Sequence, residues 1–213
     1  MSVNIKAQGS VYAKYCQYAE IHCNNLRVEN QMMHSIIHVE QRLWLGTDDK
    51  ANGKLIAGFI SAGTSVHAGI VGATAGSTTI IQFTEHLANL NEKLAKIDVL
   101  VDAESKKTNE LKAGIDKLKK LPKDKLNPDM LNKLVSTYKH HANKMGEYLS
   151  NKEQQEEEIN QYMSSVFVEA TEKLYHGVQT IVGDFQERTK REYGPSRIRY
   201  KERKVFIDPI VSG

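Results

Sequence analysis

The residues of this chain that could bind a metal or move a proton are mainly its eight histidines. His34 and His38 are four apart, so on a helix they would share a face and could both bind zinc. No nearby cysteine or carboxylate completes such a site, and neither Glu-x-x-His nor His-Glu-x-x-His occurs. We therefore predict that no residue serves as a metal ligand.

Other catalytic motifs are missing as well. The stretch GTDDKANGKL has the wrong glycine spacing for a phosphate loop, and Leu55 stands where Ser or Thr would bind magnesium. The sequence contains no Gly-x-Ser-x-Gly, no dinucleotide fingerprint and no paired-cysteine zinc motif. We predict no catalytic residues, no cofactor and no small-molecule substrate, and hence a protein that is not an enzyme.

The composition suits one ordinary domain of a reducing compartment. The chain has 213 residues, a formal net charge of +3 and a mean hydropathy of −0.49, which excludes a polytopic membrane protein. Cys16 and Cys23 are seven apart, too far on one helix for a disulfide, which indicates buried thiols. The start lacks the apolar core of a signal peptide, so we expect synthesis in the cytoplasm. A protein made in the cytoplasm could still associate with a membrane or become part of a larger particle.

Proline positions predict the elements. The four prolines leave two long proline-free stretches, in which long helices can form. They predict helices over residues 10–45, 54–121 and 128–193, and thus an all-α fold. The expected architecture is an elongated bundle with a long antiparallel coiled-coil hairpin. The predicted domains are an N-terminal helix and turn at 1–53, the long helical hairpin at 54–194 and a basic tail at 195–213.

Apolar periodicity supports this hairpin. Apolar residues recur every three or four positions through residues 87–118 and 131–185. Glu104 and Thr108 interrupt the first stripe, and the polar run at 150–158 interrupts the second. A turn near Lys125 would place Glu104 opposite Gly146, so that the two interruptions roughly coincide.

A charge-free segment of thirty residues, Leu55 to Thr84, is the most unusual part of the sequence. Its small residues form ladders with a spacing of four, which would let two helices approach closely in a membrane or in a protein core. The length suffices for a bilayer span, although His67, Gln82 and many hydroxyls lower the hydropathy. The residues predicted to serve membrane insertion or close helix packing are Gly58, Gly63, Gly69, Gly72, Gly76 and Ile70.

The basic tail is the second candidate for an interaction. Its alternating residues predict a strand at 197–207. Its charge could contact nucleic acid, acidic lipid headgroups or an acidic patch on a neighbouring subunit. The residues predicted for this polyanion or subunit contact are Arg197, Arg199, Lys201, Arg203 and Lys204.

The sequence therefore supports two main functional hypotheses and a weaker third, a nucleic-acid-associated protein that acts through the basic tail. The first is a homo-oligomeric helical assembly protein that places its glycine-rich segment in or against a membrane, as a pore, conduit or translocation device. In outline this resembles helical pore-forming toxins and some phage ejection proteins, with no shared motif. The alternative is a soluble coiled-coil structural or scaffold protein, such as a virion component, whose glycine ladder only packs helices.

Overall fold

A computed structural model describes residues 3–75, 77–122 and 127–210. Of these residues, 43% lie in strands and 36% in helices, so the predicted all-α fold is wrong. The chain forms two compact units. One comprises the segments up to Ala88 and from Asn160 onward, and the other comprises Asn89–Ile159.

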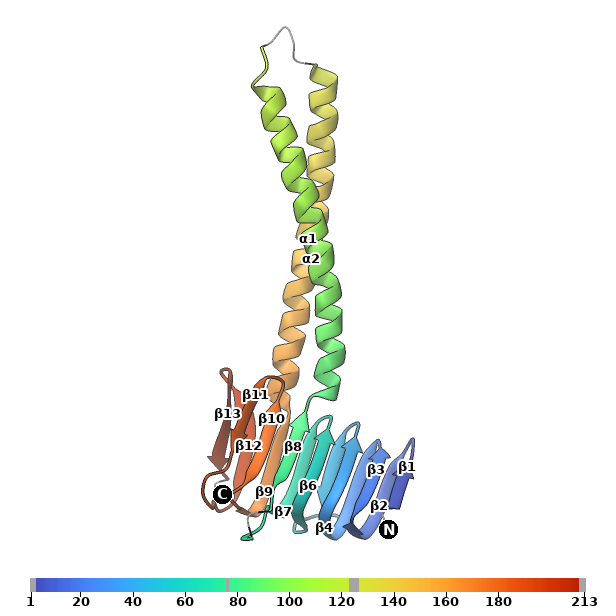
Figure 1. Ribbon diagram of the computed structural model, residues 1–213, viewed down its shortest axis with the longest axis vertical. Helices are drawn as coiled ribbons and strands as arrows, with labels where there is room; N and C mark the ends of the chain where they lie inside the picture. The colour runs from blue at the N-terminus through green and yellow to red at the C-terminus, as the bar shows by residue number, and fades with distance from the viewer. Residues whose placement is uncertain (1–2, 76, 123–126, 211–213) are drawn as a thin grey trace. The chain divides into compact units, whose positions relative to one another are not determined.

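The first unit is built from strands that follow one another with short corners (Figure 1). The described strands before the helices are β1 (Val3–Lys6), β2 (Ser10–Gln17), β3 (Ala19–Cys23), β4 (Asn25–Val39), β5 (Arg42–Leu45), β6 (Lys54–Ala62), β7 (Ser65–Val71) and β8 (Thr79–Phe83). Those after the helices are β9 (Phe167–Leu174), β10 (Val178–Val182), β11 (Phe185–Arg188), β12 (Ser196–Lys201) and β13 (Lys204–Pro209).

Parallel pairing stacks these strands into successive coils of a β-solenoid with three strand stacks. The first stack contains the starts of β2 and β4, followed by β5, β7 and β9. The second contains the end of β2, the middle of β4, the start of β6 and the ends of β7 and β9. The third contains β1, β3, the end of β4, the end of β6, β8 and β10.

The core lies inside the coils and consists of ladders of like residues. In the third stack, Ile5, Ile21, Ile37, Ile60 and Ile81 occupy equivalent positions on successive strands. The last four are at most 1% exposed. Side chains alternate between the two faces of a strand, so every second residue enters the core. Cys16 and Cys23 also point inward, and burial raises the pKa of both thiols.

A corner with left-handed backbone separates the second and third stacks. Tyr18, His34 and Ala57 have φ values of 50°, 47° and 52° and occupy equivalent positions in three coils. The Tyr18 and His34 rings stack with centroids 5.3 Å apart. His34 thus lies at a corner, while His38 stacks on His22, and its Nδ1 lies 2.9 Å from the Glu85 carboxylate. The helix predicted over residues 10–45 does not exist.

The glycines of the predicted membrane segment allow adjacent backbones to approach within the solenoid. A Cβ on Gly63 would lie 1.7 Å from the Glu40 carbonyl oxygen, and one on Gly58 would lie 2.4 Å from the Ser35 carbonyl oxygen. Gly69 approaches the backbone of the loop at residues 46–53, and Gly72, at φ 87°, approaches the side chain of Val178. The remaining two predicted residues are Ile70, which is half-buried on β7, and Gly76, which lies outside the described residues.

Antiparallel strands close the last coil. β12 pairs with β9 and with β13, and β11 pairs with β10. The tail predicted to be one strand at 197–207 is therefore a hairpin of two strands. Its turn contains Glu202 and Arg203, both at positive φ.

Two helices, α1 (Glu85–Lys119) and α2 (Pro128–Ser165), form a hairpin that occupies the chain between β8 and β9 (Figure 1) and contains the second unit. An ion pair joins Asp98 to Lys152 at 2.7 Å, and a Cβ on Gly114 would contact the Leu134 side chain. These two contacts show that the helices run antiparallel. Thr84 lies just before α1 and accepts a hydrogen bond from the Ala88 amide, while Asn127 caps α2.

A polar cluster interrupts the apolar seam of this hairpin. The Glu104 side chain is only 5% exposed and contacts His141 at 2.5 Å, Lys107 at 3.3 Å and Lys144 at 3.7 Å. The hydrogen bond with His141, aided by Lys107, lowers the pKa of Glu104 against the opposing effect of desolvation. Glu104 thus lies opposite His141, five residues from the Gly146 that the sequence pattern predicted.

The glycine-rich segment is not helical. Its described residues, 55–75 and 77–84, form β6, β7 and β8 with their connections, so they neither span a bilayer as a helix nor pack helices together. Within the described parts of the chain, α1 and α2 both lack the apolar composition needed to cross a membrane.

Candidate functional site

The outward face of the first stack carries one continuous row of polar and aromatic side chains. Strand alternation directs Leu26 into the core and Arg27 outward, and likewise Leu43 inward and Trp44 outward. Parallel pairing places equivalent residues of successive strands side by side. The members of this row are Tyr12, Arg27, Trp44, His67, Glu169 and Arg197.

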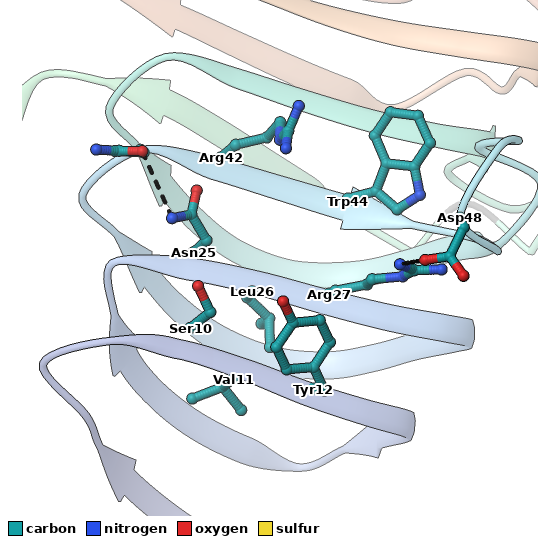
Figure 2. Close-up of a pocket in the computed structure, with 10 residues that line it drawn as sticks. Ser10, Val11, Tyr12, Asn25, Leu26, Arg27, Arg42, Trp44 and Asp48 are labelled. Carbon is teal, nitrogen blue, oxygen red and sulfur yellow. Dashed lines mark hydrogen bonds and ion pairs between the residues drawn. The ribbon is translucent and has the colours of Figure 1, made fainter.

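A groove of about 340 Å³ opens on this face across β2, β4 and β5 (Figure 2). Tyr12 is 73% exposed at one edge, while Arg42 and Trp44 come from β5. Asn25 donates a hydrogen bond to the Gln41 side chain at 3.5 Å and so places two amides in the groove. The lining is mainly polar, with aromatic rings that offer flat contact surfaces.

Trp44 is held on three sides. Its indole nitrogen donates to the Thr47 carbonyl at 2.9 Å, and its ring lies 5.0 Å from that of His67. On the side of the groove, the Arg42 guanidinium carbon is 5.7 Å from the ring centroid, within range of a cation–π contact. These contacts pre-position the indole and Arg42 before any ligand arrives.

The two arginines of the groove differ in their pairing. Arg27 forms an ion pair with Asp48, which lies in the loop after β5, and also donates to the Gly46 carbonyl at 3.3 Å. No carboxylate among the described residues lies within ion-pair distance of Arg42. Arg42 is therefore the cation of this groove that remains available to an anionic ligand.

His67 connects the groove to the end of the row. Its side chain is 14% exposed between Trp44 and Phe167, with Nδ1 3.6 Å from the Glu169 carboxylate. Burial lowers the pKa of His67 below its ordinary value, and Arg42 and Arg197 act in the same direction, while Glu169 opposes them. The neutral imidazole is thus favoured in the folded chain.

This shift predicts that acid weakens the solenoid. His67 takes up a proton at a higher pH in the unfolded chain than in the folded chain. The stability that neutral His67 contributes is therefore complete above the ordinary histidine pKa. That contribution is lost as pH falls through the lower folded pKa. Urea unfolding at about pH 8 and about pH 5 should show wild type losing more stability than His67→Gln. His176→Gln, on another part of the solenoid, should retain the His67 contribution, and equal losses in wild type and His67→Gln would contradict this assignment.

The model of one protein family, described as FapA: Flagellar Assembly Protein A beta solenoid domain, matches residues 2–205. The chain belongs to this family. No curated protein and no solved structure gives a match. The FapA domain is rich in strands, so the hypothesis of a helical pore and the alternative of a coiled-coil or virion scaffold are both wrong.

The predicted polyanion residues of this FapA domain are partly engaged within the sheet. Arg197 pairs with Glu169 and lies over the Phe167 ring at 4.7 Å, and Arg199 pairs with Asp208 at 2.5 Å. Lys201 lies 3.5 Å from the Glu202 carboxylate. Arg203 and Lys204 are exposed at the β12–β13 turn. None of these five residues lines the groove.

The sequence pattern does not indicate the groove residues of the FapA domain. Tyr12 and Trp44 fall within the predicted helix over residues 10–45, and Arg27 and Arg42 have no predicted role. In "RLWL" at 42–45, leucine alternates with Arg42 and Trp44, and this two-residue period is the signal that places Arg42 and Trp44 on one outward strand face.

Proposed function

We propose that this chain acts in flagellar assembly as a non-enzymatic binding domain whose groove holds a carboxylate-bearing segment of a partner protein. The assembly role comes from the family to which the chain belongs. The observation that supports the binding role is Arg42, which has no carboxylate partner among the described residues and lies beside Trp44 in an open groove.

The chemistry of the groove suits a peptide with an acidic side chain. A guanidinium can donate two parallel hydrogen bonds to one carboxylate, and its contact with Trp44 limits the entropy lost on binding. The Asn25 and Gln41 amides can pair with peptide groups of the same segment. Tyr12 and Trp44 supply flat surface for the aliphatic parts of the ligand. A second hollow of about 360 Å³ shares Tyr12, Arg27 and Asp48 and extends the surface toward Lys14.

Fluorescence of Trp44, which is the single tryptophan, provides a direct test. Titration with a short oligoglutamate peptide should change the emission of wild type, whereas an oligoglutamine peptide of equal length should not. Because a hydrogen bond to a charged group contributes about 1.5–3 kcal/mol, Arg42→Gln should weaken oligoglutamate binding by roughly 10- to 100-fold. Calorimetry on the same samples measures the affinity independently of the tryptophan signal.

Arg203→Gln is the matched control, since it removes one positive charge from the exposed β12–β13 turn. It should bind oligoglutamate as wild type does. If Arg203→Gln weakened binding and Arg42→Gln did not, the anion site would be the tail and the groove assignment would be wrong. Circular dichroism should show that both variants keep the wild-type fold.

The assembly role is tested in the host cell. Replacing the chromosomal copy with Arg42→Gln should reduce the number of flagella seen by electron microscopy, while Arg203→Gln should leave that number unchanged. Normal flagellation with Arg42→Gln, in spite of lost oligoglutamate binding, would separate the groove from flagellar assembly.

A further inference from the structure

The helical hairpin carries opposite charges on its two halves. Glu104, which contacts His141 and Lys144, divides it near mid-length. The half next to the turn, residues 105–121 and 127–143, has eight Lys and three Asp or Glu, a net charge of +5. The other half, residues 89–104 and 144–159, has four Lys and nine Asp or Glu, a net charge of −5. We call these the turn half and the base half.

Apolar side chains are exposed close to the middle of the same hairpin. Val99 is 69% exposed, Leu100 44% and Leu149 41%. Since Asp98 pairs with Lys152, Val99 and Leu149 lie at about the same level along the two helices. A hairpin of two helices can bury only the seam between them, so side chains away from that seam need a further layer to be covered.

We propose that two copies of the chain associate through their hairpins, packed antiparallel so that each turn half lies against the base half of the other copy. A twofold axis near the middle of the hairpin generates both contacts at once. The net charges of the halves are equal in magnitude and opposite in sign, so a second copy satisfies both. A parallel arrangement would instead place like charges together.

The geometry also gives the exposed apolar residues a role. They lie near mid-length, where the twofold axis passes and the same residues of the two copies face each other. Covering Val99, Leu100 and Leu149 would supply the apolar part of the association, while the charged halves would set its direction. This inference is independent of the groove, because no groove residue belongs to the hairpin.

Sedimentation velocity of the full chain measures the association. Raising the salt from about 0.05 M to about 0.5 M should raise the dimer dissociation constant roughly tenfold or more, because salt screens attraction between exposed charges. A parallel dimer would respond in the opposite direction, since salt screens its repulsion. Association that strengthened with salt would therefore overturn the antiparallel arrangement.

Charge reversal locates the contact. Changing four exposed lysines of the turn half to Glu takes its net charge from +5 to −3, and changing four acidic residues of the base half to Lys takes that half from −5 to +3. The turn-reversed variant carries Lys106→Glu, Lys112→Glu, Lys117→Glu and Lys119→Glu. The base-reversed variant carries Asp102→Lys, Glu147→Lys, Glu153→Lys and Glu156→Lys. Each variant alone should lose self-association, with its helix content unchanged by circular dichroism.

Mixing the two variants should restore dimers of one copy of each, since every turn half then meets a base half of opposite charge. Lys201→Glu with Lys204→Glu, on the solenoid, is the control and should associate as wild type does. A wild-type chain that stays monomeric at low salt would overturn the proposal, as would reversed variants that still self-associate. Failure of the mixture to form dimers would do the same. Each of these results would leave oligoglutamate binding at the groove untouched.

Discussion

Gly63→Ala is expected to destabilise the solenoid by more than about 4 kcal/mol, which is enough to unfold many single domains. The added Cβ would lie 1.7 Å from the Glu40 carbonyl oxygen and 2.6 Å from its carbon. Both atoms belong to the backbone of the adjacent coil, so no side-chain rotation relieves the overlap. The Gly63 amide also donates to the Val39 carbonyl, and its own carbonyl accepts a hydrogen bond from Tyr162 at 2.8 Å. Urea unfolding followed by Trp44 fluorescence measures the loss.

Replacing a glycine by alanine elsewhere in the chain should have the opposite effect on stability. Gly146 lies within α2, and nothing within 4 Å would meet a Cβ there. Gly146→Ala should therefore stabilise the hairpin by about 1 kcal/mol, since alanine is the better helix former. If residue 63 lay in a helix, Gly63→Ala would likewise stabilise the protein. A stabilising Gly63→Ala would thus contradict the solenoid and return this segment to the helix that the sequence pattern predicted.

Ile37→Ala should cost about 2–5 kcal/mol of unfolding free energy, because it leaves a cavity in a packed interior. Ile37 is fully buried and lies between Ile21 and Ile60 in the ladder of the third stack. Strand pairing fixes the backbone positions of both neighbours, so their side chains can fill the space only in part. Equilibrium unfolding in urea gives the free energy, and differential scanning calorimetry should show a lower midpoint.

Ile36 is the natural control, since it is the same residue type one position earlier. It points outward and is 47% exposed, so Ile36→Ala should change stability by less than about 0.5 kcal/mol. The contrast between the two adjacent positions depends on the two-residue period of a strand. Similar losses at Ile36 and Ile37 would show that β4 does not have the register described here.

The sequence pattern predicted the central helices but extended them too far. The apolar period of three and four residues corresponds to helices between Glu85 and Lys119 and between Pro128 and Ser165. The absence of proline between residues 54 and 85 and between residues 165 and 193 also favours helix there, which extends the predicted helices to residues 54 and 193. Proline is equally rare inside parallel strands, because each strand interior needs its amide for pairing. A proline-free stretch therefore cannot distinguish a helix from a solenoid.

The sequence contains a short repeat that indicates the solenoid. Ile5, Ile21 and Ile37 recur every 16 residues and stack in the core, as Lys6, His22 and His38 do on the outside. A fixed period of this kind indicates coils of a solenoid. The period then lengthens to 23 residues between Ile37 and Ile60, because the loop at residues 46–53 enters the coil, and the hairpin interrupts it altogether. Only two clean repeats remained visible.

The neighbours of each residue in the groove are harder to predict from the sequence than the strands themselves. The alternation in "RLWL" is enough to place Arg42 and Trp44 on one outward face. Which residues lie beside them depends on pairing between strands that are far apart in sequence, such as Arg27 with Trp44. A local pattern carries no information about that register, so the neighbours of Trp44 required the three-dimensional structure.

The position of the hairpin has a consequence for how the chain folds. Phe83 and Val182 pair in neighbouring strands although 99 positions separate them along the chain. Joining such distant segments is slow, because the entropy of closing a long loop is lost before the new contacts form. Antiparallel helices form from local contacts, and once Asp98 meets Lys152 the two ends of the insertion are already close. We therefore expect the hairpin to shorten the effective loop, so that the last coil pairs with β8 sooner than an unstructured insertion of the same length would allow.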